Sequence, residues 1–192
     1  MKKSAIVLLA AGFEEVEAVT PIDYLRRAGI EVTVAAIGGD LTVKGARDIT
    51  VNADTTLQDL GRFSLINLYD AIVIPGGMPG ATNIAASPEA GTLITNMAAA
   101  GKLICAICAS PAVVLAPLGI LSGKKFTCFP GMEAKVQGGK WTDERATIDG
   151  NVITSRSAGS AGEFAVAIIG RLLGAAEGDK IAQAVLLQKM EV

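Results

Sequence analysis

The chain has 192 residues, a length suited to one domain spanning 1–192, and 51% of them are hydrophobic while 19% are charged. The net charge of −2 gives no reason to expect nucleic acid or an anionic membrane surface as a partner. No apolar run approaches the ~18 residues of a membrane span. The chain has no histidine, which excludes a Cys–His mechanism, and its three cysteines favour free thiols in a reducing compartment, so we expect a cytoplasmic protein.

Apolar runs of strand length alternate with helical patterns along the chain. The first half predicts a strand at 4–10, a helix at 15–28, a strand at 31–37, a hairpin at 42–51 and a strand at 71–74. The spacing predicts that the helix buries Val16, Val19, Ile22 and Leu25. Pro21 lies inside this helix, so we expect a kink or a restart there.

The second half continues the alternation. It predicts helices at 87–100, 109–118, 161–173 and 178–189, and strands at 103–107, 126–129, 147–148 and 152–154. Ser87 and Pro88 give the first of these helices a strong start, and Asp149-Gly150 suits a hairpin turn. The alternation predicts an α/β fold, with a mainly parallel sheet covered on both faces by helices and sites at the carboxyl ends of the strands.

Cys108 stands where a strand pattern runs directly into a helical pattern, in the segment KLICAICASPAVVLA. A cysteine at such a junction is typical of a nucleophile elbow, which lifts a side chain above the end of a sheet. The positive end of the helix and nearby amides, including that of Ala109, are expected to stabilise the thiolate, which is the reactive form. The alternative is an inert buried thiol.

Two glycines, in Pro75-Gly76-Gly77, follow the strand at 71–74. They let the backbone turn sharply and present amides close to a ligand. With the amide of Ala109 they are suited to form an oxyanion hole, although an ordinary turn is the alternative. The motif is not G-x-G-x-x-G, so it predicts no dinucleotide site.

Three glutamates crowd the start of the first helix. Glu14 and Glu15 are expected to face solvent, where acidic side chains suit the helix dipole. Glu17 lies within the apolar pattern and is expected to turn inward, where a carboxyl pressed against a sulfur has a raised pKa. Such a group can donate a hydrogen bond or act as a general base.

Other motifs are weaker. Cys105 and Cys108 spell C-x-x-C, but Cys105 lies inside a strand, where residues three apart are ~10 Å distant and cannot form a disulfide. Cys128 is expected in the core. Three cysteines and no histidine are too few soft ligands for zinc, and the P-loop-like segment at 119–125 has Lys125 where a Ser or Thr would hold Mg²⁺. We therefore predict no metal and no cofactor.

Four segments occur in order along the chain: AGFEEVEAVTPIDYLRRAG, VIPGGMPGA, AICASPAVVLA and TSRSAGSAGEFA. Together they resemble the ThiJ/PfpI superfamily, most closely its YajL-like and parkinsonism-associated deglycase branch, over essentially the whole chain. The resemblance implies a flavodoxin-like (class I glutamine amidotransferase-like) sandwich, usually a homodimer. It also implies an oxidation-prone nucleophile at Cys108, a protonated acid at Glu17 and oxyanion amides at Gly77 and Ala109.

The resemblance extends to the surroundings of the site. Arg47 matches a family arginine that reaches the partner's site across the dimer interface, and Arg27 is similar to a residue near that interface. Phe129 stands where many members place a histidine, so their protease and amidotransferase-like triads cannot operate here. Asn52 replaces an interface cysteine of some members. Ser110 replaces a common glycine and is expected to narrow the pocket.

Three functional hypotheses follow. In the first, Cys108 adds to the aldehyde of methylglyoxal or glyoxal, free or as an early protein adduct, while Glu17 shuttles the proton and water releases a hydroxy acid. In the second, the protein is an oxidative-stress sensor or chaperone whose Cys108 is oxidised to sulfenate and sulfinate. The third is a structural dimer with a vestigial site. We favour the enzyme because one pocket supplies nucleophile, oxyanion donors and acid together.

Overall fold

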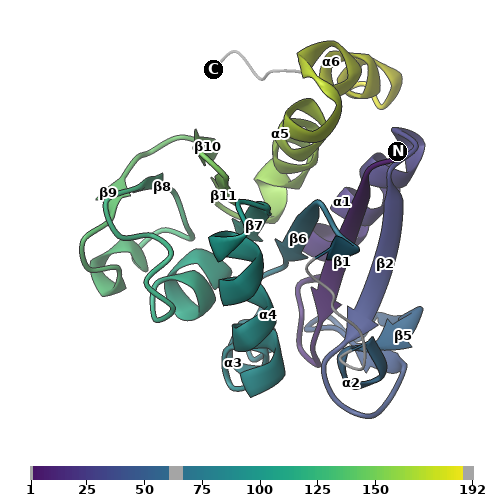
Figure 1. The fold of residues 1–192 in the computed structure, drawn as a ribbon, viewed down its shortest axis with the longest axis vertical. Helices are drawn as coiled ribbons and strands as arrows, with labels where there is room; N and C mark the ends of the chain where they lie inside the picture. Colours follow the sequence, from purple (N-terminus) through teal and green to yellow (C-terminus); the bar gives the residue numbers. More distant parts are fainter. Residues whose placement is uncertain (1, 61–66, 188–192) are drawn as a thin grey trace.

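A seven-stranded, mostly parallel sheet forms the centre of the molecule (Figure 1). The computed structural model describes residues 2–60 and 67–187. The strands of this sheet are β1 (Ser4–Leu9), β2 (Glu31–Ala36), β5 (Thr55–Thr56), β6 (Ala71–Ile74), β7 (Leu103–Ile107), β10 (Ala146–Asp149) and β11 (Val152–Ser155). Their order is β10-β11-β7-β6-β1-β2-β5, and only β10 pairs in the antiparallel sense. The succession β2-β1-β6-β7-β11 is the flavodoxin-like order.

Helices cover both faces of the sheet, as the alternating pattern predicts (Figure 1). One face carries α1 (Glu15–Arg27), α5 (Ala161–Leu173) and α6 (Ala175–Ala184), and the other carries α2 (Leu57–Leu60), α3 (Gly80–Ala85), α4 (Pro88–Ala99) and the π-helical turn η2 (Pro111–Leu115). Within β1, Val7 packs with the core under α1 and α5, whereas Ile6 and Leu8 pack with the core under α3 and α4. This period of two is the signature of a strand buried on both faces.

Most of the predicted elements are confirmed. Ser87 caps α4, accepting a hydrogen bond from the amide of Ala90 at 3.2 Å, with Pro88 in the first turn. The hairpin predicted at 42–51 is formed by β3 (Thr42–Lys44) and β4 (Thr50–Asn52). The strands around Asp149-Gly150 are β10 and β11. Three short elements, β5, α2 and α3, were not predicted.

The first helix differs from the prediction in two respects. It runs unbroken through Pro21, so the expected restart does not occur; the missing amide deprives only one carbonyl, that of Glu17, of its helical donor. Val16 and Val19 are 48% and 44% exposed, because the buried face is rotated. That face consists of Glu15, Glu17, Ala18, Pro21, Ile22 and Leu25.

The helix predicted at 109–118 is shorter than expected and differs in type. Ser110 is helical, and Pro111–Leu115 forms a turn of the π type, closed by the amide of Ala116 on the carbonyl of Pro111 at 3.0 Å. The amide of Val113 donates to the carbonyl of Ala109 at 2.9 Å, an α-type bond, and Pro111 lies in this first turn, where a proline is tolerated. Cys108 therefore precedes a short helical segment rather than the longer helix expected.

The strand predicted at 126–129 is shorter than expected. β8 (Lys125–Phe126) pairs with β9 (Lys140–Trp141), which was not predicted. Beyond it the backbone leaves the ladder, because Thr127 donates to the hydroxyl of Thr154 at 2.8 Å and Phe129 donates to the carbonyl of Cys108 at 2.8 Å. Cys128, between them, lies in the core as expected.

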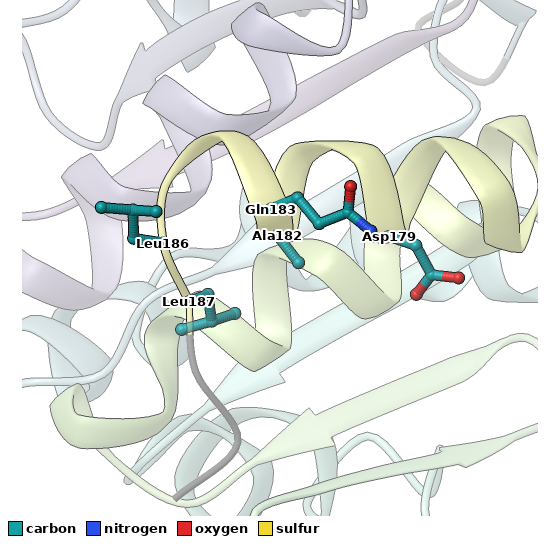
Figure 2. A pocket seen from close by; sticks show the side chains of 5 residues that line it. All are labelled: Asp179, Ala182, Gln183, Leu186 and Leu187. Atoms are coloured by element: carbon teal, nitrogen blue, oxygen red, sulfur yellow. The ribbon is translucent and has the colours of Figure 1, made fainter.

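The last helix starts earlier than predicted. α6 begins directly after Gly174, where α5 ends, and stops at Ala184 rather than reaching 189; positions 188 and 189 lie outside the described residues. A shallow hollow of about 440 Å³ lies along its carboxyl end (Figure 2). It is lined by Asp179, Ala182, Gln183, Leu186 and Leu187. Leu187 covers Gly162 of α5, where an added Cβ would lie 2.7 Å from its Cδ1.

Candidate active site

A cleft of about 710 Å³ opens where the carboxyl ends of three parallel strands meet. Glu17 follows β1, Gly77 follows β6 and Cys108 follows β7, and all three line the cleft. The strand order reverses between β1 and β6, so the cleft lies at the topological switch point, where flavodoxin-like folds place their sites. The structure thus brings together the three strand ends that the sequence singled out.

Cys108 occupies a strained elbow. Its φ is 64°, a left-handed conformation that non-glycine residues rarely adopt. The backbone is held on both sides, since its amide donates to the carbonyl of Ser155 at 2.9 Å and its carbonyl accepts from Phe129 at 2.8 Å. Gly76 leaves room for the side chain, because a Cβ there would lie 2.6 Å from the Cβ of Cys108. The predicted nucleophile elbow is confirmed as a geometry.

Two backbone amides, those of Gly77 and Ala109, act on the sulfur of Cys108 and lower the pKa of its thiol. Gly77 has a φ of 89°, and an added Cβ would lie 2.6 Å from the carbonyl oxygen of Gly12, so only glycine fits this turn. Two such donors are suited to stabilise an oxyanion formed on an atom bound to the sulfur.

Glu17 faces the sulfur from the first turn of α1. Glu14 caps this helix, and its Oε2 accepts the amide of Glu17 at 2.8 Å. The Glu17 side chain is buried, with the whole residue 1% exposed. Its Oε2 accepts the amide of Gly76 at 3.0 Å, and the side chain of Cys108 and the backbone of Ala158 also act on the carboxyl and lower its pKa. The expectation that Glu17 turns inward is confirmed.

Glu17 and Cys108 share their protons. Burial, with a smaller contribution from Glu14, raises the pKa of Glu17 from 4.5 to about 7, against the opposing hydrogen bonds from Cys108 and the two backbone amides. Burial and the nearby charge of Glu17 raise the pKa of Cys108 to about 12, although the Gly77 and Ala109 amides lower it. Between these values the pair holds one proton, either as carboxylate and thiol or as carboxylic acid and thiolate.

This pairing corrects the expectation of an intrinsically stabilised thiolate. Next to an ionised Glu17 the sulfur keeps its proton, because burial and the like charge outweigh the two amides. A thiolate therefore forms when Glu17 takes the proton. The ionised carboxyl of Glu17 keeps the thiol protonated, and the same carboxyl can activate the thiol by accepting its proton.

Glu15 does not face solvent, which corrects a second expectation. It is 5% exposed, and its Oε1 accepts the amide of Arg47 at 2.5 Å, fastening the loop after β3 to α1. The Arg47 side chain lies on the rim of the cleft and is exposed. Arg27 lies at the other end of α1, where it pairs with Asp23 at 2.7 Å, and the structure does not bring it to the cleft.

Ser110 does not narrow the cleft as expected. It is fully buried, and its hydroxyl turns away from the cleft to donate to the carbonyl of Pro75 at 2.5 Å. Phe129, in contrast, lines the cleft as predicted. Several residues that line the cleft were not predicted. Ser157 and Ala158 could have been found in the segment TSRSAGSAGEFA, whereas Met132 and Lys135 carry no signal in the sequence.

The three cysteines differ sharply in environment. All are free thiols, and Cys105 and Cys128 are fully buried whereas Cys108 reaches the cleft. Burial raises the pKa of Cys105 well above its usual value, and burial followed by the charge of Glu133 raises that of Cys128 to about 11. Within residues 2–60 and 67–187, no cluster of three or more His, Cys, Asp or Glu side chains is placed to bind a metal ion. In the same ranges no helix has the length and apolar character needed to cross a membrane.

Comparison with known proteins places this site in a family. A model of the DJ-1/PfpI family matches residues 3–171. Protein dj-1beta of Drosophila melanogaster is 40% identical over 189 residues, covering 97% of this chain and 98% of the relative. Glutathione-independent glyoxalase DJR-1.2 of Caenorhabditis elegans is 35% identical over 191 residues, covering 98% of each. Protein DJ-1 homolog B of Arabidopsis thaliana is 41% identical over 182 residues, 95% of this chain, which spans 41% of the length of that relative.

Solved structures agree with these relatives. The crystal structure of Drosophila melanogaster DJ-1beta superposes with a TM-score of 0.91 at 39% identity, covering 98% of this chain and 100% of that one. A structure of Toxoplasma gondii DJ-1, described as oxidized, also gives a TM-score of 0.91, at 38% identity over 96% of this chain and 98% of that one. The chain belongs to the DJ-1/PfpI family, which includes a glyoxalase, and its flavodoxin-like fold is confirmed.

Proposed function

We propose that this protein is a cofactor-independent enzyme that converts small 2-oxoaldehydes, methylglyoxal or glyoxal, into 2-hydroxy acids. The substrate is the free aldehyde or its early adduct on a protein. The observation that carries the proposal is the cleft in which Cys108, Glu17 and the Gly77 and Ala109 amides converge. A relative named as a glutathione-independent glyoxalase supports it.

In the first step, Glu17 takes the thiol proton and the sulfur of Cys108 attacks the aldehyde carbon. A carbon–sulfur bond forms, and the aldehyde oxygen gains the negative charge. The amides of Gly77 and Ala109 stabilise this oxyanion, and Glu17 then returns the proton to it. The product is a hemithioacetal beside an ionised Glu17.

In the second step, the Glu17 carboxylate removes the proton from the former aldehyde carbon and delivers it to the neighbouring carbonyl carbon through an enediol, while the hydroxyl proton of the hemithioacetal passes to the oxygen of that neighbouring carbon. This isomerisation gives a thioester without any net gain or loss of electrons. Water then attacks the thioester, the carbon–sulfur bond breaks, and the hydroxy acid leaves while the pair regains its proton. Because one carboxyl carries every proton and the chain has no histidine, turnover is expected to be modest.

The test measures D- and L-lactate formed from methylglyoxal by the wild type and by Cys108→Ser. Loss of methylglyoxal alone would mislead, because Arg and Lys side chains also trap aldehydes. Lactate from the wild type and none from Cys108→Ser is the expected result, with Cys105→Ala as a control that keeps the activity, because Cys105 is buried away from the cleft. Lactate formation that survives in Cys108→Ser would refute the proposal.

A second candidate function is oxidation sensing at the same sulfur. Cys108 is the cysteine that reaches the cleft, and an oxidised structure of the Toxoplasma gondii relative shows that oxidation occurs in a family member. Peroxide would transfer one oxygen to the thiolate and leave as water, giving sulfenate, and a second peroxide would give sulfinate. The two amides and protonated Glu17 are suited to donate to these oxygens.

Peroxide titration followed by peptide mass spectrometry separates the two functions. Sensing predicts that Cys108 gains oxygen at peroxide concentrations that leave Cys105 and Cys128 unmodified. Equal modification of all three cysteines, or of none, would count against it. A protein that senses oxidation but forms no lactate would leave the sensor as the function of the site.

A further inference from the structure

Ser110 and Glu17 are joined through a single peptide group. The hydroxyl of Ser110 donates to the carbonyl of Pro75 at 2.5 Å. The amide on the other side of the same peptide bond, that of Gly76, donates to Oε2 of Glu17 at 3.0 Å. Ser110 is fully buried, so no water competes for its hydroxyl. The hydroxyl of Ser110 therefore donates to the Pro75–Gly76 peptide, and this peptide in turn donates to the carboxyl of Glu17, which faces Cys108.

A peptide group transmits such an interaction for two reasons. It is planar, so a hydrogen bond that fixes the direction of the carbonyl also fixes the direction of the amide. A donor on the carbonyl oxygen also polarises the group, which strengthens the amide as a donor by roughly 10–30%. The second residue of this peptide is a glycine, which offers little resistance of its own to rotation. The hydroxyl of Ser110 supplies the restraint that a bulkier residue would supply elsewhere.

We infer that Ser110 is a positioning residue of the Glu17–Cys108 pair. Its hydroxyl holds the Pro75–Gly76 peptide with the amide directed at Glu17, and so favours carboxylate with thiol over carboxylic acid with thiolate. The inference rests on the proposed roles of these two residues, but it concerns where their shared proton lies rather than which substrate reacts.

The other groups that act on Glu17 are independent of the Ser110 hydroxyl. The titratable side chains that face it are Cys108, from the end of β7, and Glu14, from the cap of α1, and Arg47 lies on the rim of the cleft. The backbone of Ala158 completes the set. Among the described residues, the hydroxyl of Ser110 bonds only Pro75. Removing this hydroxyl therefore changes one donor to Glu17 and leaves the charges in place.

The test is the pH dependence of the alkylation rate of Cys108 by iodoacetamide, read by mass spectrometry of its peptide. In the wild type the rate rises with pH and levels off once the pair has lost its first proton, at about pH 7. In Ser110→Ala the carboxylate is less stable, so the midpoint moves up by about 0.3–0.7 pH unit and the plateau rises by about two- to fivefold. The shift of the midpoint and the rise of the plateau have the same cause, the less stable carboxylate. At pH values below both midpoints, the alkylation rates of the wild type and of Ser110→Ala should therefore be equal.

Two further variants separate positioning from loss of structure. Ser110→Thr keeps a hydroxyl and is expected to restore the wild-type profile. Thr154→Val removes another fully buried hydroxyl, the acceptor for the amide of Thr127, and is expected to lower stability without moving the profile. A Ser110→Ala profile that coincides with the wild type, or a Thr154→Val profile that shifts equally, would overturn the inference.

The alkylation profile does not depend on turnover, so its outcome is separate from that of the lactate assay. A wild type that makes no lactate, combined with a shifted Ser110→Ala profile, would refute the proposed function and keep the inference. Lactate formation combined with an unmoved profile would refute the inference alone.

Discussion

Two carboxyl groups lie at opposite ends of the parallel sheet, and their surroundings differ in one decisive respect. Asp70 precedes β6 at the amino ends of the strands, whereas Glu17 lies at the carboxyl ends. Asp70 accepts the amide of Ser4 at 3.1 Å and pairs with Lys3 at 3.3 Å and Lys102 at 4.0 Å. In the described part of the chain, Glu17 makes no ion pair, and its neighbours are a thiol, another carboxyl and backbone amides.

The difference shows in the pKa values. Burial raises the pKa of Asp70, but the Ser4 amide, Lys3 and Lys102 together outweigh it, so the pKa is lowered. Burial of Glu17 outweighs the opposing effects of Cys108 and of the Gly76 and Ala158 backbone, and no cation faces the carboxyl, so its pKa rises to about 7. A carboxyl with cationic partners ties strands together, whereas a buried carboxyl without them keeps a proton that it can exchange near neutral pH.

The largest expected effect of removing one of these two carboxyls is on catalysis. Glu17→Gln keeps the shape and the Gly76 hydrogen bond but cannot exchange a proton, so lactate formation from methylglyoxal should fall by about 10²- to 10⁴-fold. Asp70→Asn is the matched change at the other end of the sheet and should leave turnover within about twofold. Unchanged turnover in Glu17→Gln would show that the mechanism is wrong.

The two carboxyls should also affect stability in opposite directions as pH changes. The pKa of Glu17 rises from 4.5 to about 7 on folding, so its contribution to stability is fully present below about pH 4.5 and is lost as pH rises through about 7. Glu17→Gln should therefore gain about 3 kcal/mol relative to the wild type between about pH 4.5 and 8. The lowered pKa of Asp70 acts in reverse, with stability present above its ordinary value of 3.8 and lost at more acidic pH.

Chemical denaturation at several pH values measures both contributions. The difference in unfolding free energy between the wild type and Glu17→Gln should grow with pH, whereas that between the wild type and Asp70→Asn should shrink as pH falls below about 3.8. Parallel curves for the wild type and Glu17→Gln would mean that Glu17 titrates at its ordinary pH in the folded protein.

Close packing at the carboxyl ends of the strands, around Glu17 and Cys108, gives a third prediction. An added Cβ at Gly76 would lie 2.6 Å from both Oε2 of Glu17 and the Cβ of Cys108, so Gly76→Ala must push the pair apart. We expect it to cost about 2 kcal/mol of unfolding free energy and most of the activity. Gly39→Ala, where nothing lies within 4 Å, is the matched control and should change stability by at most about 0.5 kcal/mol. Equal thermal stability of the two variants would contradict the geometry of the site.

The smallest effect on stability is expected from changes at the amino ends of the strands. Asp70→Asn weakens the bond to Ser4 and removes two partly exposed ion pairs, whose contributions are reduced by solvent screening. We expect a loss of about 1 kcal/mol at neutral pH, measured by urea denaturation. Lys3→Met should lose less, because Asp70 keeps the Ser4 amide and Lys102. A larger loss in Lys3→Met than in Asp70→Asn would show that the cation, not the carboxyl, organises the strand ends.

The sequence predicted much of the fold and the centre of the site. Apolar runs located the strands that build the sheet, and the junction at Cys108, the glycines before Met78 and the inward Glu17 located the three strand ends. These features are local, because a strand-to-turn junction and a glycine pair are visible in consecutive residues.

The errors arose where distant contacts decide the outcome. The π-helical turn after Cys108 depends on how the segment from Pro111 to Leu115 packs under α3, and the burial of Glu15 depends on a loop more than thirty residues away, at Arg47. The role of Ser110 is also of this kind, because its partner Pro75 lies on another strand end. A sequence shows that such residues are present but not which of them meet.

The most direct test of the shared proton is a carbon NMR titration of the glutamate side-chain carboxyls, with Glu17 identified by the signal that Glu17→Gln lacks. The account predicts a Glu17 midpoint at about pH 7, accompanied in the Cys108→Ser variant by a changed midpoint, because the partner that shares the proton is altered. A Glu17 midpoint near its ordinary value of 4.5 would contradict it, because a carboxyl that is fully ionised well below neutral pH could not exchange the proton of Cys108.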